Sequence, residues 1–425
     1  MYSKLIVRSL AAAAIMMTAG SAMAVNLYGG GATFPAVPYV GDDYLNVTPN
    51  ARLSTSAGNL AGTNGNGSNA TEAGLTASSA FGSYAATSGN AVSYCQTGSG
   101  FGKTRLNTNS GAQGDCRDFS DNSPQGLSAA SGTPDFIGTD SPYSTSDYNA
   151  FIAGANYATK QGVTQIPVLA GAIALTYDAN GTASLPLTTT QVCQIYSGAI
   201  TDWASVPGSG LSGTIKVVYR SDNSGTSFAF TSYLYNKCAS VLPAGFAPNQ
   251  NFLAAFGGSL PFTGVAASGN NNVVTTAKAA GGLGLGYADF GEVANQGAAY
   301  ALVDGFDPVN FGTSKITLAT ADLVRGQVLN GATFAAVPAG PSAAIANCTF
   351  VVRPTATISN RYPIAAFTYL ATYARANAQA LAVRGLIQQV RTQAPPVGFA
   401  HVDGNPLHAS QINAAVTGTT NNCVQ

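Results

Sequence analysis

Short apolar runs alternate with segments of helical spacing along most of the sequence, and this alternation limits the fold more than any other feature. Four apolar runs have the length and flanking turn residues of buried strands: 166–169, 172–177, 215–219 and 283–287. Three segments space their apolar residues along one helical face: 190–196, 228–235 and 362–390. Because helices that alternate with strands cover the faces of a sheet, the sequence predicts an α/β fold.

The N-terminus has the pattern of a secretory signal peptide at residues 1–24. Lys4 and Arg8 precede an apolar run, and Ala22-Met23-Ala24 has the small residues of a cleavage site. The run is too short to span a bilayer. We therefore expect a mature, soluble chain beginning near Val25 and located in the periplasm, with release into the medium as the alternative.

Charged residues make up 8% of the chain, against roughly 25% in an average soluble domain. The 18 basic and 18 acidic residues cancel. Nucleic-acid binding needs a basic surface, so we expect no nucleic-acid partner. The mature length of about 400 residues is enough for two domains with hydrophobic cores.

Six cysteines fit an oxidising compartment, where disulfides persist. Sequence alone allows fifteen pairings. Local closure favours three pairs: Cys95–Cys116, Cys193–Cys238 and Cys348–Cys423. A metal site is disfavoured because no C-x-x-C occurs, and we expect neither metal nor cofactor. His401 and His408 are predicted to be surface residues without a role.

The segment 46–90 differs from the rest of the chain. It is rich in Asn, Gly, Ser, Thr and Ala, has few aromatic residues and shows little periodicity. This composition predicts a loop-rich surface insertion, in which short strands could still occur.

The segment 215–234 joins a strand-like run to a helical stretch through Arg220 and a turn of small residues. A helix N-terminus offers unpaired N–H groups and partial positive charge to an anion. Ser224 and Thr226 add hydroxyl donors, Gly225 allows close backbone approach, and Arg220 adds a charged fork. The plainer interpretation is an ordinary N-cap after a strand.

Two other glycine-rich turns offer donors of the same kind. In the turn at 29–35, a ligand could meet the Thr33 hydroxyl and the N–H groups of Thr33 and Phe34. In the turn at 98–104, Ser99 stands where a helix could begin. A nucleotide-binding P-loop is rejected there, because that pattern needs a glycine where Thr97 stands.

Asp140 follows a strand-like run and precedes Pro142. A carboxylate repels an anion, but a proton on the anion can offset this repulsion by forming a hydrogen bond to the carboxylate. Asp140 could accept a hydrogen bond from protonated phosphate, whereas ionised sulfate would leave it unpaired. Otherwise, Asp140 only caps a turn.

Taken together, these motifs resemble the periplasmic phosphate-binding component of bacterial phosphate ABC importers, and the related DING proteins. The match rests on Gly-Ala-Thr-Phe-Pro at 31–35, Gly-Ser-Gly at 98–100, Gly-Thr-Asp-Ser-Pro at 138–142 and Arg-Ser-Asp-Asn-Ser-Gly-Thr-Ser-Phe at 220–228. It implies these phosphate contacts: Thr33, Phe34 through its backbone, Ser99, Asp140, Arg220, Ser224, Gly225 and Thr226. It also implies that Asp222 pairs with Arg220. The extra length between Ser99 and Asp140 departs from the family, so a neighbouring serine could replace Ser99.

The resemblance implies a two-lobed type II binding protein with its ligand in a cleft. One lobe would comprise 25–168, including the polar insertion, and 300–425, and the other 169–299. Such a protein would be a monomer that closes around inorganic phosphate and delivers it to a membrane permease.

Other functions remain as alternatives. A receptor for arsenate, sulfate or molybdate would use a similar pocket, although Asp140 disfavours the latter two. A phosphatase or serine hydrolase is disfavoured because no G-x-S-x-G motif occurs and both histidines lie near the C-terminus. The polar insertion would also suit an extracellular adhesin-like protein.

Overall fold

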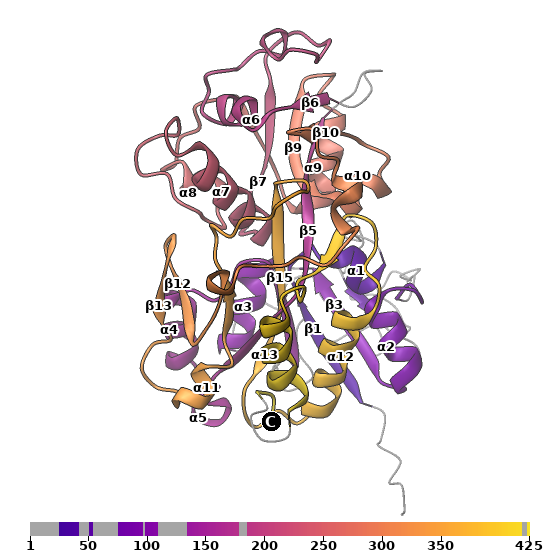
Figure 1. Cartoon of the computed structure of the whole chain (residues 1–425), viewed down its shortest axis with the longest axis vertical. Coiled ribbons are helices and arrows are strands. Elements are labelled where there is room, and N and C mark those ends of the chain that lie inside the picture. The colour runs from indigo at the N-terminus through magenta and orange to yellow at the C-terminus, as the bar shows by residue number, and fades with distance from the viewer. Residues whose placement is uncertain are drawn as a thin grey trace, which may run out of the picture.

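The protein has two lobes, one above the other in Figure 1, and one long strand runs through both. This strand, β5 (Val163–Tyr177), is buried along its whole length, as its nearly continuous apolar sequence requires. Its lower part pairs with β15 (Ala365–Tyr373) and its upper part with β9 (Gly284–Asp289), so one sheet continues between the lobes. The runs predicted as separate strands, 166–169 and 172–177, belong to this single strand. The computed structural model describes residues 25–41, 51–53, 75–96, 98–108, 134–177, 185–418 and 423–425.

The lower lobe, as drawn in Figure 1, holds a sheet whose first strands bring three loops together. The strands follow the order β2 (Ala51–Leu53), β3 (Ala91–Gln96), β1 (Asn26–Gly31), β4 (Phe136–Thr139), β15 and β5. β1 is parallel to both β3 and β4, so the carboxyl ends of these strands meet at one edge. Ligands bind at such edges in α/β sheets.

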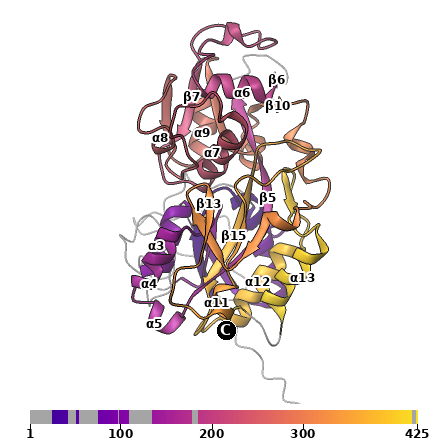
Figure 2. The same ribbon diagram turned by 60° about the vertical axis from the view of Figure 1, so that its left-hand side comes forward.

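Helices flank both faces of the lower sheet, with α3 and α4 on one side and α12 and α13 on the other (Figure 2). The lower-lobe helices are α1 (Ala36–Val40), α2 (Ala80–Ser88), α3 (Ser99–Thr108), α4 (Thr145–Ala153), α5 (Tyr157–Lys160), α11 (Ala343–Ala346), α12 (Ala380–Thr392) and α13 (Pro406–Thr417). The short strands here are β11 (Leu323–Arg325), β12 (Gln327–Asn330), β13 (Thr333–Ala336), β14 (Phe350–Val352) and β16 (Phe399–His401).

The upper lobe places a long helix, α7 (Gly225–Cys238), directly after strand β7 (Lys216–Arg220). Its other strands are β6 (Leu185–Leu187), β8 (Gly264–Ala267), β9 and β10 (Ala299–Val303). Its helices are α6 (Thr189–Tyr196), α8 (Phe252–Ala255), α9 (Gly269–Lys278) and α10 (Phe290–Asn295). Three 3-10 turns complete the described elements: Trp203–Ser205, Pro308–Gly312 and Thr320–Asp322. Sequence reasoning therefore located α6, α7, β7 and β9 to within a few residues.

The prediction of one helix over 362–390 is wrong. The first part is strand β15, which lies between β4 and β5, and only the second part is helical, as α12. Ala376 has a φ of 48°, which interrupts any helix there. Pairing with strands distant in sequence overrides the helical spacing of this alanine-rich stretch.

The segment 46–90 is not loop throughout, because it contains α2. Ser79 caps this helix by accepting a hydrogen bond from the Gly82 N–H, and Phe81 is buried. The Phe81 ring stacks on Tyr39 with ring centroids 4.8 Å apart. Residues 54–74 lie outside the described ranges.

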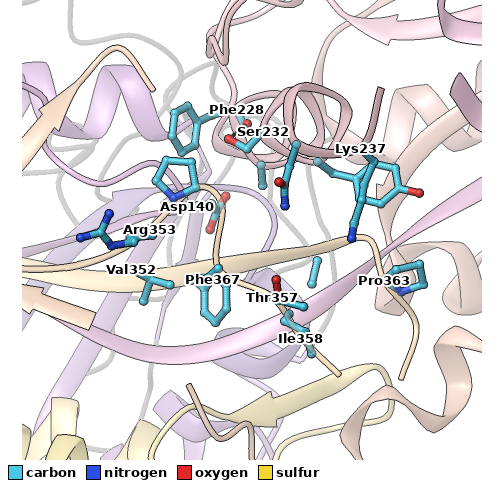
Figure 3. A pocket seen from close by; sticks show the side chains of 16 residues that line it. Asp140, Phe228, Ser232, Lys237, Val352, Arg353, Thr357, Ile358, Pro363 and Phe367 are labelled. Atoms are coloured by element: carbon cyan, nitrogen blue, oxygen red, sulfur yellow. Dashed lines mark hydrogen bonds between the residues drawn. The ribbon is translucent and has the colours of Figure 1, made fainter. Parts of the chain in front are cut away.

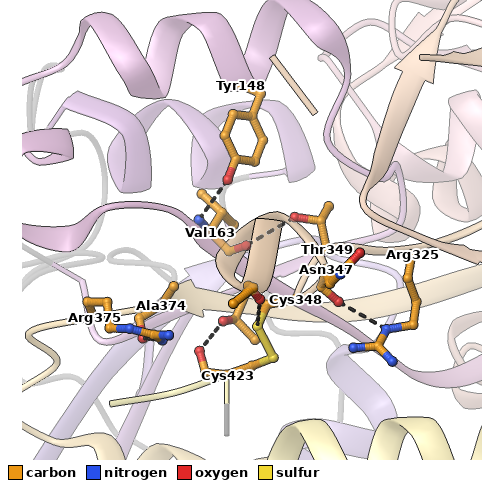
Figure 4. The surroundings of a disulfide bond; sticks show 11 residues. Tyr148, Val163, Arg325, Asn347, Cys348, Thr349, Ala374, Arg375 and Cys423 are labelled. Carbon is orange, nitrogen blue, oxygen red and sulfur yellow. Dashed lines mark hydrogen bonds between the residues drawn. A yellow bond between two sulfur atoms is a disulfide. The ribbon is translucent and has the colours of Figure 1, made fainter. Parts of the chain in front are cut away.

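Two of the predicted disulfides are present. Cys193–Cys238 joins α6 to α7, and Cys348–Cys423 ties the C-terminal residues beside β5 (Figure 4). The predicted Cys95–Cys116 pair falls outside the described residues, which do not include Cys116. Disulfides are typical of proteins that fold outside the cytoplasm.

His408 is not a surface residue, contrary to prediction. It lies on the inner face of α13 and is 1% exposed, whereas His401 on β16 is partly exposed. Within the described ranges, none of the helices is both long enough and apolar enough to cross a membrane.

Candidate anion-binding site

The start of α7 in the upper lobe lies directly against two residues of the lower lobe. A Cβ atom at Gly225 would stand 2.4 Å from Ser99 Oγ and 2.6 Å from Asp140 Cβ. No side chain fits in that space, so glycine is required for this approach. The two lobes are closed at this point.

Arg220 ends β7 and is almost completely buried. Its Nε and Nη2 donate to the Asp222 carboxylate at 2.7 and 2.5 Å, which fixes the guanidinium plane. Its Nη1 donates to Asn270 Oδ1 at 2.7 Å and to Thr33 Oγ1 at 3.3 Å. Burial would raise the pKa of Asp222, but the Arg220 charge and hydrogen bonds, including one from the Gly269 N–H, hold that pKa below its ordinary value.

Asp140 follows β4 and is 2% exposed, yet neither carboxylate oxygen has a hydrogen-bond partner. Its backbone N–H donates to Ser99 Oγ at 3.0 Å. Burial raises the pKa of Asp140 to about 7, while the Thr368 hydroxyl, the Arg220 charge and the Ser99 hydroxyl oppose the rise. Neither the Thr368 hydroxyl nor the Ser99 hydroxyl forms a hydrogen bond of ordinary geometry with the Asp140 carboxylate oxygens. A buried carboxyl group without a hydrogen-bond partner can share a proton with an oxygen atom of a ligand.

The first turn of α7 supplies further donors. Ser224 is the N-cap, and its Oγ accepts from the Ser227 N–H at 3.2 Å, which leaves its own hydroxyl proton to donate. Thr226 is completely buried, and its Oγ1 has no hydrogen-bond partner. Buried polar groups without partners are rare and call for an explanation such as a ligand.

Phe34 turns its side chain into the core, where its ring packs edge-on against Phe399 at 5.4 Å. Only its backbone can therefore serve a ligand. Pro35, the next residue, is the N-cap of α1. The structure thus brings together residues from both lobes: Thr33, Phe34, Ser99 and Asp140 below, and Arg220, Ser224, Gly225 and Thr226 above.

A family model described as the PBP superfamily domain matches residues 53–388, which is most of the chain. The chain belongs to the PBP superfamily.

The PBP superfamily domain of this chain is similar to parts of curated proteins. Alkaline phosphatase L of Pseudomonas aeruginosa is 35% identical over 199 residues, which cover 46% of this chain and 48% of that protein. A phosphate-binding protein from an unknown prokaryotic organism is 37% identical over 112 residues, or 26% of this chain and 30% of that one. The match spans about half the length of the first relative and less of the second.

Solved structures share the fold at low sequence identity. The phosphate-bound periplasmic phosphate-binding protein PfluDING superposes with a TM-score of 0.58 at 22% identity, over 94% of this chain and 96% of that one. The phosphate-binding protein of Stenotrophomonas maltophilia gives a TM-score of 0.57 at 21% identity, over 95% and 96%. The predicted two-lobed α/β fold of a type II binding protein is confirmed.

Sequence reasoning missed several residues that support the site of this PBP superfamily member. Asn270 accepts from Arg220 and donates to Asp289 Oδ2 at 2.8 Å, which fixes its amide orientation. The Tyr287 hydroxyl accepts from the Arg220 N–H at 3.2 Å. Thr368 lies beside Asp140 on β15, the strand that had been interpreted as helix. The Ser-Gly start of α9 was a local signal that could have identified Asn270.

Proposed function

We propose that the protein binds inorganic phosphate in the periplasm and delivers it to the membrane permease of an ABC importer. The observation that carries this proposal is the Asp140 carboxyl group, buried without a hydrogen-bond partner beside the start of α7. Protonated phosphate offers the O–H donor that this acid needs, whereas ionised sulfate offers none. The relative and the structural neighbour named as phosphate-binding proteins support the same ligand.

The proposed complex divides the contacts by chemistry. Asp140 accepts the proton of the ligand, and Arg220 neutralises its charge while Asp222 and Asn270 hold the guanidinium in place. The remaining donors are the hydroxyls of Thr33, Ser99, Ser224 and Thr226 and the backbone N–H groups of Phe34 and Gly225. Directed hydrogen bonds in a dry site would give the selectivity, which suits a chain with zero formal net charge.

Ligand release would require the lobes to separate. The proposed division assigns 25–168 and 300–425 to one lobe and 169–299 to the other, and its second boundary falls within β10, which pairs with β5 and β6 in the upper lobe. The hinge would lie where β5 and β15 pass between the lobes. Closure makes contacts such as Arg220 to Thr33 that an open form lacks, so the ligand shifts the population toward the closed state. We propose that the protein acts as a monomer.

Binding without turnover is the proposed activity, although one relative is named a phosphatase. Acyl or phosphoryl transfer needs a base or a metal beside the reacting atom. His408 is enclosed on α13, and its ring faces the Thr320 carbonyl in the lower lobe. Among the described residues, no group of three or more His, Cys, Asp and Glu side chains is arranged to hold a metal ion.

Isothermal titration of the mature protein with phosphate, arsenate and sulfate tests the function. We expect heat from phosphate and none from sulfate at matched concentration. Arsenate carries a proton as phosphate does, so it should compete. Sulfate binding as tight as phosphate, or no phosphate binding at all, would overturn the proposal. Incubation with a phosphate monoester, monitored for released phosphate, checks the absence of turnover.

A further inference from the structure

Phe228 is an upper-lobe residue whose ring packs against the lower lobe. It lies one turn into α7, three residues after Gly225. Its ring forms a small apolar cluster with Leu329 of β12 and Val351 of β14, and the side chain is 9% exposed. Val324 and Phe334 of the lower lobe pack against the same cluster. The cluster therefore exists only when the lobes are closed.

Phe228 also lies between two cavities. One cavity reaches Asp140 and is lined by the flank of α7 and by residues 352–367 of the lower lobe (Figure 3). The other is polar and opens at the mouth between the lobes, where Gln250 Nε2 donates to Ser141 Oγ at 2.7 Å. Phe228 lines both cavities, so it lies where the cavity at Asp140 and the cavity at the mouth approach each other.

We infer that Phe228 is an apolar latch, which holds the lobes closed through the cluster that it forms with Leu329 and Val351. This role makes Phe228 a positioning residue, because its ring would act through lobe closure and not through contact with the anion. The inference rests on the proposed phosphate binding, since closure matters through the ligand that it traps.

The physical basis is the burial of a phenyl ring in one state only. In an open form the Phe228 ring and the apolar cluster below it would face water, so closing removes that surface from solvent. Interactions made only in the closed state raise the apparent affinity, because they increase the fraction of protein that is competent to hold the ligand. Release requires opening, so the latch should act mainly on the dissociation rate.

The test uses Phe228→Ala, Leu329→Ala and the double variant, with phosphate as the probe. Titration calorimetry gives affinity, and stopped-flow release into a phosphate trap gives the dissociation rate. From the apolar surface involved, we expect each single variant to weaken affinity roughly tenfold to hundredfold, through faster release. Because both residues belong to one apolar cluster, the fold-loss of affinity in the double variant should be smaller than the product of the two single-variant losses.

Controls separate the latch from general damage. Phe228→Leu should restore most of the affinity, whereas Phe306→Ala, which truncates an exposed phenylalanine, should leave affinity and release unchanged. Leu329→Ala tests the contact from the other lobe if Phe228→Ala folds poorly. Unchanged release in both single variants, or full multiplicativity in the double variant, would overturn the latch. Wild-type protein that binds no phosphate would instead overturn the proposed function, and the role of the latch with it.

Discussion

Arg220 Nη1 of the upper lobe donates a hydrogen bond to Thr33 Oγ1 of the lower lobe at 3.3 Å. The two residues are 187 positions apart in the chain. Thr33 lies just beyond the carboxyl end of β1, and Arg220 is the last residue of β7. This hydrogen bond therefore joins the two halves of the candidate site. The site is therefore a property of the closed arrangement of the lobes.

Replacing Arg220 by alanine should weaken phosphate binding by about 2–4 kcal/mol, because a buried charge-assisted fork is lost and the Asp222 carboxylate loses the cation that neutralises it. Arg220→Lys should recover only part of the loss, since an ammonium group cannot hold Asp222 and the ligand with a planar fork. Titration calorimetry measures both. Arg375→Ala, near the Cys348–Cys423 disulfide (Figure 4), is the matched control. An Arg220→Ala variant with wild-type affinity would remove Arg220 from the site.

A site built around a buried hydrogen bond can prefer one ligand over another by about 10⁴-fold. Replacing Asp140 by asparagine should reduce the preference for phosphate over sulfate by roughly 100-fold or more. The amide can donate as well as accept, so an ion without a proton no longer meets an unpaired charge. Competition titration of the two anions measures the ratio. Asp202→Asn, at the cap of a distant turn, should keep the wild-type ratio. Equal preference in wild type and Asp140→Asn would contradict the role given to Asp140.

Without phosphate, raising the pH should open the lobes. Burial raises the pKa of Asp140 from 3.8 to about 7 in the closed form, so the closed form holds the proton more tightly than an open, hydrated form does. The closed form is thus favoured at low pH, and this advantage is lost as the pH rises from about 4 to about 7. Small-angle X-ray scattering should show a larger radius of gyration at pH 8 than at pH 5. Asp140→Asn should show no such change, and an identical response in both proteins would refute the linkage.

Gly225→Ala should abolish tight phosphate binding while leaving the fold intact. The added Cβ would stand 2.4 Å from Ser99 Oγ, which prevents closure, whereas alanine suits the first turn of a helix. Calorimetry should show little or no heat, and urea unfolding without phosphate should match wild type. Tight binding by this variant would mean that the lobes do not need to approach so closely.

Removing the Cys348–Cys423 disulfide, with both residues changed to serine, should destabilise the protein by about 2–4 kcal/mol. The bond closes a sequence separation of 75 residues and anchors the C-terminus beside β5. Urea denaturation measures the loss. Phosphate affinity at low temperature should be unchanged, because no predicted phosphate contact lies near this bond. A large loss of affinity in a folded variant would show that the bond also positions the site.

Local sequence determined the parts of the site that form within a few residues. The turn after β7 carries its own arginine, capping serine and glycine, so its ability to meet an anion could be predicted from residues 220–228 alone. The pairs Cys193–Cys238 and Cys348–Cys423 followed from proximity along the chain and order among the cysteines. These features depend on backbone geometry and capping chemistry, which act over short distances.

Tertiary structure alone decided the rest. Whether 365–373 became strand or helix depended on pairing with β4 and β5, and Thr368 reached Asp140 only through that pairing. The apolar cluster of Phe228, Leu329 and Val351 likewise needed the two lobes to close. A hydrophobic pattern indicates that a side chain will be buried, but it does not specify which residues that side chain will pack against. Partners distant in sequence are chosen by packing, which depends on the whole chain at once.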